Sequence, residues 1–249
     1  MLKEERHRLI LNEVALHNRV LLGDLAEQLG VSIDTVRRDV KELDTNGKLR
    51  KVHGGAIAIG FTNYTPKHTN IYALEEKIKI AEKAISFLKE GSVILIDGGT
   101  TCLELARLIP EQLALTCFTL SLPVALELLN KPNAKVIFIG GELSKDAQIA
   151  IGANAVHQLS EIQVDYGFIG TGYVDAADGL TEFDWEIVQV KKAVIAAAKK
   201  TVLLSISEKL NSSHRYKTCD TNMIDTLITE RNPSDTVLKA FKKQKIQLL

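Results

Sequence analysis

Two groups of residues in this 249-residue sequence have types and spacings that suit negatively charged partners. The first lies in "SIDTVRRDVKELD" (Ser32 to Asp44), where Arg37 and Arg38 are adjacent and Lys41 follows. Arginine can donate two hydrogen bonds to guanine, and threonine can contact a thymine methyl group or a phosphate. The cluster therefore indicates either nucleic-acid recognition or solvated charges on a helix surface.

The second group is the glycine- and threonine-rich stretch of "VILIDGGTTCLELARLIP", in which Asp97 precedes Gly98, Gly99, Thr100 and Thr101. Glycines at the carboxyl end of a strand let the backbone approach a ligand, and the next helix offers free N–H groups to an anion. No GKS or GKT follows, so the stretch is not a Walker loop. An anion site and a simple tight turn with a helix cap both fit the pattern.

A lysine on an apolar helix face is a third candidate. The helix expected from Phe183 to Lys199 has an apolar stripe made of Ile187, Val190, Val194, Ile195 and Ala198. Lys191 falls within that stripe, whereas Lys192 points to solvent. A buried lysine is costly unless it is paired or reaches water. Glu186 or Asp97 could pair with it, and so could a bound phosphate next to the glycine loop.

Three short helices must position the basic cluster. The patterns predict helices at residues 3–17 and 21–30 and a third that begins after Ser32, a good N-cap. In the third helix the stripe expected to pack on the first two is Ile33, Val36, Val40 and Leu43. Its other side then presents the polar residues, and "KLRKVHGGAIAIG" predicts a β-hairpin that reaches adjacent phosphates as a wing.

The remainder has a different texture. Residues 60–72 are polar and irregular and read as a linker, and an amphipathic helix is expected over residues 73–89. Helical segments then alternate with seven apolar runs: "SVILID", "LALTCFTL", "AKVIFIGG", "VDYGFIG", "KTVLLSI", "IDTLIT" and "KIQLL". Near-continuous apolar strands between helices predict a mostly parallel sheet covered on both faces.

The totals limit the function classes. Lys and Arg number 31 and Asp and Glu number 31, so any case for nucleic-acid binding rests on local placement. No apolar run is long enough to span a bilayer, and the charged start is not a secretory signal. The scattered cysteines Cys102, Cys117 and Cys219 suit neither a zinc site nor a disulfide framework. We expect a cytoplasmic protein with no metal, no cofactor and no membrane association.

The stretch "TVRRDVKELDTNGKLRKVHGGA" resembles the DNA-binding signature of DeoR-type bacterial transcriptional regulators, and "LLGDLAEQLGVS" matches the preceding helix. The resemblance implies a winged helix-turn-helix domain over residues 1–58, in which the third helix enters the major groove of operator DNA. We expect the DNA contacts to come from Ser32, Thr35, Arg37, Arg38, Lys41, Lys48, Arg50, Lys51 and His53.

A linker over 59–72 and an α/β effector-sensing domain over 73–249 are expected to follow. Five segments resemble the DeoR sensor domain: "DGGTT", "SLPVALELL", "FIGGEL", "DYGFIGTGYVDAADGLT" and "VKKAVI". The resemblance implies a fold similar to ribose-5-phosphate isomerase and effectors that are phosphorylated sugars or related metabolites. Leu120 replaces the family's usual Asn, and "SISEK" replaces "DSSK". The resemblance implies ligand contacts by Asp97, Gly98, Gly99, Thr100, Thr101, Ser121, Gly140, Gly141, Gly170, Asp175, Gly179 and Lys191.

These inferences predict a homo-oligomeric repressor of sugar-metabolism genes, a dimer or tetramer, that a phosphorylated sugar releases from double-stranded operator DNA. The alternative is a sugar-phosphate isomerase fused to a DNA-binding domain. Isomerisation needs a carboxylate base, yet Val190 stands where those enzymes carry a glutamate, and Asp175 is the remaining candidate. A helix-turn-helix used only for protein contacts is disfavoured by the basic wing.

Overall fold

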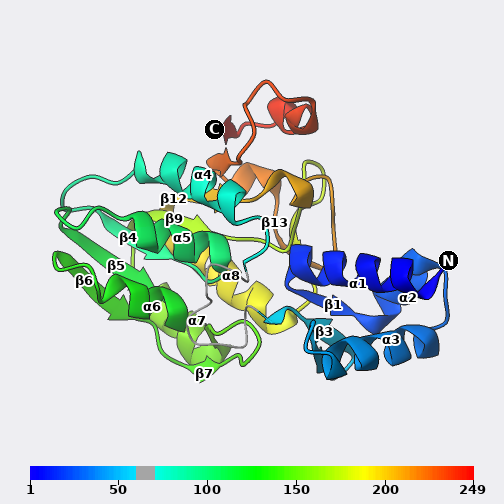
Figure 1. Cartoon of the computed structure of the whole chain (residues 1–249). Coiled ribbons are helices and arrows are strands. Elements are labelled where there is room, and N and C mark those ends of the chain that lie inside the picture. Colours follow the sequence, from blue (N-terminus) through cyan, green and yellow to red (C-terminus); the bar gives the residue numbers. More distant parts are fainter. Residues whose placement is uncertain (60–70) are drawn as a thin grey trace. The chain divides into compact units, whose positions relative to one another are not determined.

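The computed structural model describes residues 1–59 and 71–249. Contacts divide the chain into two units, Met1–Tyr72 and Ala73–Leu249, which are described separately (Figure 1). Most of the linker expected over 59–72 lies outside the described residues. No helix in the described ranges is long and apolar enough to cross a membrane.

The N-terminal unit combines three helices with a small antiparallel sheet of strand order β1-β3-β2. In chain order its elements are α1 (Lys3–His17), β1 (Arg19–Leu21), α2 (Leu22–Leu29), α3 (Ile33–Thr45), β2 (Arg50–Val52) and β3 (Gly55–Ile57). Gly30 ends α2 with a left-handed φ of 63°, and the Ser32 side chain caps α3 by accepting the Thr35 amide. The predicted winged helix-turn-helix is confirmed, with β1 as an extra strand.

The inward face of α3 differs from the prediction at two positions. Val36, Val40 and Leu43 are buried as expected, but Ile33 is 44 % exposed. The expectation for Ile33 is wrong because it is the first helical residue after the cap, outside the packed turns. Asp39 occupies the inward position three residues after Val36 and is buried.

The C-terminal unit is built on a parallel sheet with strand order β15-β14-β12-β9-β4-β5-β6. Its strands are β4 (Val93–Ile96), β5 (Leu115–Thr119), β6 (Ala134–Phe138), β9 (Val164–Ile169), β12 (Ala198–Leu204), β14 (Thr226–Ile228) and β15 (Gln247–Leu248). Each overlaps one of the seven predicted apolar runs, and β12 alone begins before its run, at Ala198. Because all run in the same direction, the loops after them meet at one edge of the sheet.

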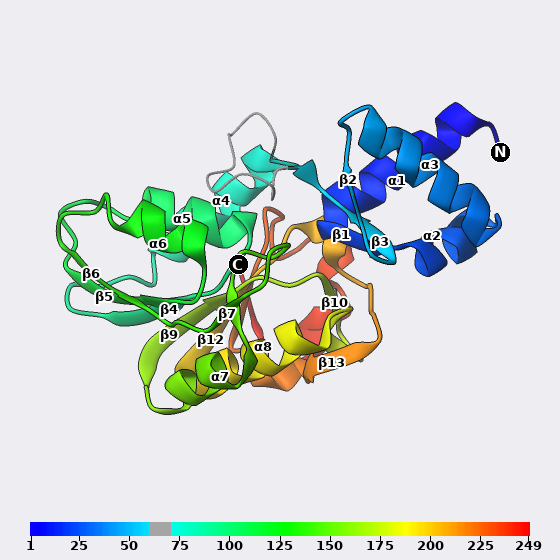
Figure 2. The ribbon, with the colours of Figure 1, turned by 90° about the horizontal axis from the view of Figure 1, so that it is seen from below.

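Helices cover both faces of this sheet, as predicted, with α4, α5 and α6 on one side and α7 and α8 on the other (Figure 2). Their bounds are α4 (Leu74–Ile85), α5 (Thr100–Leu108), α6 (Leu122–Leu128), α7 (Gly152–Ser160) and α8 (Trp185–Ala197). Two helices are shorter than expected: α4 stops before Lys89, and α8 ends at Ala197. Ala198 therefore begins β12 and does not belong to the helical stripe.

Two small antiparallel sheets were not predicted from sequence. One pairs β10 (Tyr173–Asp175), β11 (Gly179–Glu182) and β13 (Tyr216–Cys219), and the other pairs β7 (Glu142–Leu143) with β8 (Ala150–Ile151). Short 3-10 turns complete the unit at η3 (Ser207–Lys209), η4 (Thr221–Met223), η5 (Thr236–Leu238) and η6 (Phe241–Lys243). Glu182 of β11 and Lys209 of η3 are buried charged residues at the carboxyl edge of the main sheet.

Candidate functional site

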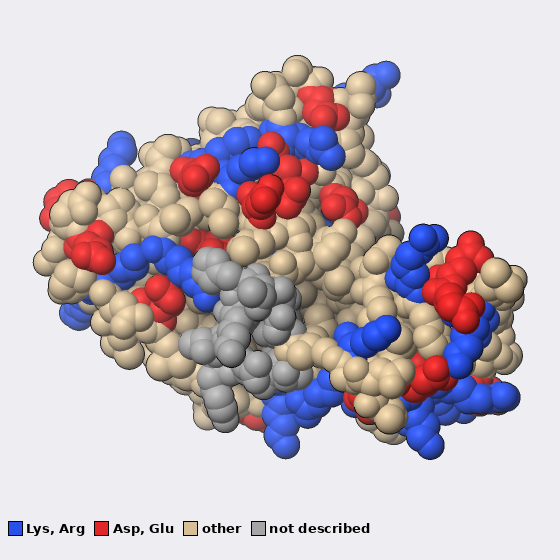
Figure 3. All heavy atoms as spheres, in the orientation of Figure 1, with Lys and Arg blue, Asp and Glu red and all other residues tan. Residues whose placement is uncertain are grey.

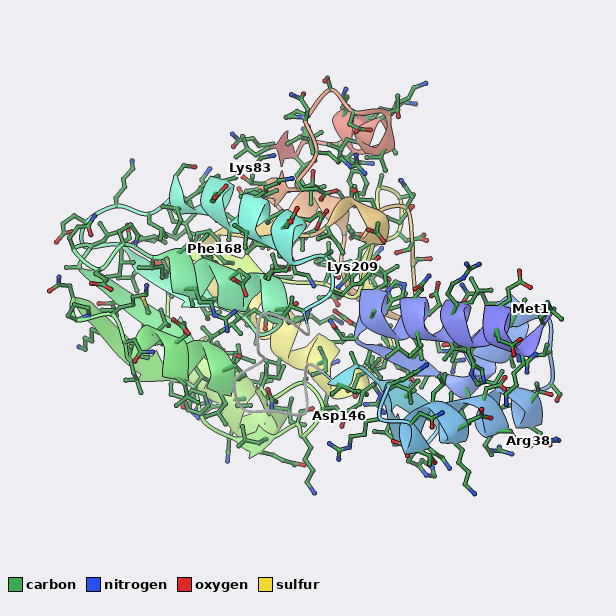
Figure 4. The ribbon with its side chains drawn as sticks, in the orientation of Figure 1. Met1, Arg38, Lys83, Asp146, Phe168 and Lys209 are labelled. Carbon is green, nitrogen blue, oxygen red and sulfur yellow. The ribbon has the colours of Figure 1, made fainter. Side chains whose placement is uncertain are left out.

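The outward side of α3 carries the basic residues predicted for DNA contact. Arg38 and Lys41 are exposed, and no hydrogen bond or ion pair holds either side chain within the described ranges; Figure 4 shows Arg38 at the outer edge of its unit. Arg37 is exposed too, but it pairs with Asp34 in the same helix. Arg38 and Lys41 are therefore the cations of α3 most available to a partner.

The other predicted DNA contacts lie at the start of α3 and on the hairpin. The hydroxyl oxygens of Ser32 and Thr35 are 2.9 Å apart, so both take part in the helix cap. Asp44 of α3 accepts the backbone N–H of Lys51 at 3.0 Å and ties the hairpin to the helix. The exposed hairpin residues are Lys48, Arg50, Lys51 and His53. Figure 3 shows basic side chains gathered along this edge of the unit.

In the C-terminal unit, Asp97 directly follows β4 and is 1 % exposed. Neither carboxylate oxygen has a hydrogen-bond partner in the part of the chain that the structure describes, and the nearest cation is Lys191 Nζ, 3.7 Å from Oδ2. Burial raises the pKa of Asp97, more than Lys191 and the nearby amides of Gly98 and Gly170 lower it. A buried carboxyl that accepts no well-formed hydrogen bond is unusual and marks this edge as a candidate site.

Lys191 of α8 is buried as predicted and bridges two acids. Its Nζ donates to the Gly170 carbonyl at 2.5 Å and lies 2.8 Å from Glu182 Oε1. Burial alone would lower the pKa of Lys191, but the carboxylates of Glu182 and Asp97 outweigh burial and raise it. The suggested pairing with Asp97 is confirmed, while that with Glu186 is wrong because Glu186 is exposed in the first turn of α8.

Two further buried lysines lie close to this cluster. Lys209 of η3 donates to the Thr171 carbonyl at 3.0 Å, and burial lowers its pKa to about 8. Lys77 of α4 is also buried, and burial followed by the positive charge of Lys209 lowers its pKa to about 7. Because burial outweighs the nearby acids and lowers both pKa values, an anion at this edge would stabilise both protonated side chains.

The glycine loop brings backbone N–H groups to the same edge. Gly99 begins α5 with a φ of 101°, and no side chain caps this helix. The first amides of α5, at Thr100, Thr101 and Cys102, therefore lack intrahelical partners and suit an anion. A Cβ at Gly98 would collide with Ile149 and lie 3.8 Å from Ser121 Cβ, so the loop after β4 contacts the loop after β5 and the residue before β8.

The other predicted ligand contacts lie further from this cluster. Gly140 and Gly141 follow β6, two strands away from β4, and Gly140 exchanges hydrogen bonds with Gln158. Asp175 and Gly179 form the β10–β11 turn, where Asp175 accepts the amides of residues 177 and 178. Three residues of extended strand, about 10 Å, separate Gly179 from Glu182. Turn formation therefore accounts for this pair.

Sequence reasoning missed Glu182, Lys209, Lys77 and Asp39. Lys77 shares an inward face with Ile80, Ala81 and Ala84, and Asp39 lies between apolar residues of α3, so the spacing that revealed Lys191 was present in both helices. Within the described ranges, no group of three His, Cys, Asp or Glu side chains could hold a metal ion.

Two family models match the chain, one in each unit. The model described as the DeoR-like helix-turn-helix domain matches residues 6–60. The model described as the DeoR C terminal sensor domain matches residues 73–231 and so spans most of the second unit.

Curated relatives match along the whole length. The glycerol-3-phosphate regulon repressor of Escherichia coli (strain K12) is 31% identical over 250 residues, which cover 100% of this chain and 99% of that protein. The HTH-type transcriptional repressor GlcR of Bacillus subtilis (strain 168) is 30% identical over 253 residues, covering 100% and 96%. An uncharacterized HTH-type transcriptional regulator of Haemophilus influenzae is 29% identical over 250 residues, covering 100% and 97%.

Solved structures give a more distant likeness. Ribose 5-phosphate isomerase A from Methanocaldococcus jannaschii is similar over 54% of this chain and 53% of that chain, with a TM-score of 0.39 and 20% identity. The translation initiation factor eIF-2B from Pyrococcus horikoshii OT3 is similar over 86% and 74%, with a TM-score of 0.43 and 13% identity. Likeness at this level supports no statement about activity or ligands.

Proposed function

The chain belongs to the DeoR family of helix-turn-helix transcriptional regulators, and from this premise we propose that it represses sugar-metabolism genes until a phosphorylated sugar or related metabolite releases it from its operator. The relatives named above are regulators or repressors, and this chain is likewise a regulator rather than an enzyme. We place its activity in the cytoplasm, where its DNA partner would be. The proposed domains are residues 1–58 and 73–249, joined by 59–72.

The observation that carries the DNA-binding proposal is the free basic face of α3. Arg38 and Lys41 are exposed on the second helix of the helix-turn-helix, and no acid within the described ranges neutralises them. We expect Arg38 to read a base edge in the major groove, as arginine does on guanine O6 and N7. The other proposed contacts would position α3 on the phosphate backbone. They are Ser32, Thr35, Arg37, Lys41, Lys48, Arg50, Lys51 and His53.

For the effector we propose the carboxyl edge of the main sheet, centred on residues 97–101. A phosphate there would accept the first amides of α5 and face Lys209 and Lys77, while Asp97 would accept a sugar hydroxyl. The sequence suggested that Lys191 contacts the ligand, but in this arrangement it has a structural part. Since Glu182 and Asp97 already neutralise it, it holds the loop at Gly170 in place. Gly98, Gly99, Ser121 and Gly170 line the proposed site.

The response to effector requires two states with different effector affinities. We propose that a dimer or tetramer, assembled through the C-terminal domain, presents two recognition helices to operator half-sites one helical turn or more apart. Effector binding would favour a state in which that spacing no longer matches the operator. Loops from β4, β9 and β12 would transmit the change, because each contributes directly to the site.

The isomerase alternative would depend on Asp175 as its base. Asp175 Oδ1 accepts the amides of residues 177 and 178, so this carboxylate already has a structural part in its own turn. An aldose–ketose isomerase needs a carboxylate positioned to move a proton between adjacent carbons. Together with the named relatives, this favours regulation over catalysis.

The test begins with selection of duplex DNA from a random-sequence library by the purified full chain. Fluorescence anisotropy then measures affinity for an enriched and a scrambled duplex as salt is raised, followed by a sugar-phosphate panel. We expect an enriched motif, a steep salt dependence and release by one compound. If no motif is enriched, the proposed function is wrong; if a motif is enriched but no compound releases the protein, the effector half is wrong.

A further inference from the structure

Asp39 is a buried carboxylate on the same helix as the proposed DNA contacts. It is 4 % exposed and lies among the buried side chains of Val36, Val40 and Leu43. A carboxylate in such a place is strongly unfavourable unless it is paired and hydrogen-bonded. Its position directly after Arg38 makes its contacts relevant to where the arginine points.

Arg6 of α1 donates a hydrogen bond to each carboxylate oxygen of Asp39. Its Nε donates to Oδ2 at 2.5 Å and its Nη2 donates to Oδ1 at 3.1 Å, and His7 Nε2 lies 3.1 Å from the same Oδ1. Burial alone would raise the pKa of Asp39, but the hydrogen bonds of Arg6 and His7 outweigh burial and hold it below its usual range. The carboxylate is therefore charged at neutral pH and fully bonded.

A second ion pair joins the same two helices. Lys3 Nζ lies 2.6 Å from Glu42 Oε2. Lys3 precedes Arg6 by three residues on α1, and Glu42 follows Asp39 by three residues on α3. About half of each side chain is exposed, so water and salt weaken the pair. It has the same chemistry and connects the same helices, and it is therefore a matched control for the buried fork.

The fork constrains α3 in a way that apolar packing does not. Contacts of Val36, Val40 and Leu43 are non-directional, so small rotations or shifts of the helix change them little. A two-pronged guanidinium–carboxylate pair has a fixed plane and fixed distances. Arg38 and Asp39 are adjacent and project about 100° apart around the helix axis, so fixing Asp39 fixes the direction from which Arg38 leaves the helix.

We propose that Arg6 and Asp39 are positioning residues for DNA recognition: they set the rotation and height of α3 so that Arg38 meets its base edge, without touching DNA themselves. The inference rests on the proposed function of α3. It goes beyond that function by making sequence discrimination depend on a contact in the interior of the domain. Productive hydrogen-bond geometry tolerates displacements of only about 0.5 Å, so a modest rotation suffices to lose it.

The test compares affinity for the enriched duplex with affinity for its scrambled counterpart, in the full chain at one salt concentration. Arg6→Lys keeps the positive charge but removes the fork. We expect it to lower the enriched-to-scrambled ratio about tenfold, which is the value of one well-placed arginine–guanine contact, with scrambled affinity within about twofold of the natural chain's. Lys3→Ala should leave the ratio unchanged.

A second variant separates positioning from stability. Arg6→Met combined with Asp39→Leu replaces the pair by apolar side chains of similar size, which preserves folding in comparable cases. Circular dichroism and urea unfolding confirm that each variant is folded. A folded double variant that keeps the natural ratio would overturn the proposal, as would equal loss in Lys3→Ala. If the natural chain enriches no sequence, the proposed function fails first and this inference with it.

Discussion

The two units bury carboxylates in opposite ways. Asp39 in the N-terminal unit receives hydrogen bonds on both oxygens from Arg6 and His7. Asp97 in the C-terminal unit accepts no well-formed hydrogen bond within the described ranges, although the amides of Gly98 and Gly170 lie nearby, and its nearest cation is shared with Glu182. The protein alone satisfies the hydrogen bonding of the Asp39 carboxylate, whereas the Asp97 carboxylate can still accept hydrogen bonds.

This difference separates a structural charge network from the proposed effector site. A completed network lowers the pKa of its acid, as at Asp39, and fixes two helices relative to each other. An incomplete one raises the pKa of Asp97 and lowers the pKa of Lys209 and Lys77, so charged groups are buried at a cost in free energy. Such a cost is expected where a ligand supplies the missing partner.

The largest effect should come from Lys191→Met, which removes the one cation that forms an ion pair with buried Asp97 and Glu182 among the ion pairs described for them. We expect a loss of about 3–5 kcal/mol in the free energy of unfolding, because uncompensated buried charge is strongly destabilising. Urea unfolding measures it. Lys192→Met is the control, since Lys192 is exposed over the Trp185 ring at 5.8 Å. Equal losses in both variants would contradict the structural part assigned to Lys191.

Lys209→Gln should act on the response rather than on the fold. Removing this cation should raise the effector concentration needed for release from operator DNA about hundredfold, the value of a strong charged hydrogen bond. Operator affinity without effector should stay within about twofold, since Lys209 and α3 belong to different units. Lys199→Gln alters an exposed lysine that pairs with Asp165 and is the control in the same anisotropy titration. An unaltered response in Lys209→Gln would remove Lys209 from the site.

Arg38→Ala should weaken binding to the enriched duplex by about 1–3 kcal/mol and relax preference at one base pair. Arg37→Ala should cost less, because Asp34 already engages Arg37 in the free protein. Both variants should respond to effector with an unchanged midpoint. Anisotropy on duplexes with each base changed in turn measures the preference, and an equal or larger loss in Arg37→Ala would reverse the assignment of the two arginines.

The last prediction concerns pH, where effector binding and stability should move in opposite directions. Lys209 and Lys77 have folded-state pKa values of about 8 and about 7, below the ordinary 10.5. Between pH 7 and about 10 the unfolded chain therefore holds more protons, so the free energy of unfolding contributed by these lysines rises with pH.

An anionic effector needs the protonated lysines, so its affinity should fall from pH 7 to 9, by up to about tenfold per pH unit for each proton involved. Operator binding without effector should change little over this range, because the pKa of Asp39 is held below its usual value and the fork stays intact. Release titrations at several pH values measure this. Effector affinity that rises with pH would contradict the proposed charges.

The main fold could be predicted because buried parallel strands are apolar along their whole length, and seven such runs correspond to the strands of the main sheet. The small sheet that carries Glu182 could not, because its strands are short and β13 pairs with β11 across more than thirty residues. Lys77 and Asp39 were open to prediction from helical spacing. Lys209 was not, since a three-residue 3-10 turn has no apolar period.

The most direct test of the account titrates the enriched operator complex with matched pairs of compounds, each sugar or polyol beside its phosphate ester, in natural chain and Lys209→Gln. We expect one phosphorylated compound to release the natural chain and its unphosphorylated counterpart to have no effect. Lys209→Gln should need about a hundred times more of the ester. Release by an unphosphorylated compound at the same concentration as its ester, in both proteins, would contradict the claim that the incompletely paired buried charges of the C-terminal unit await an anion.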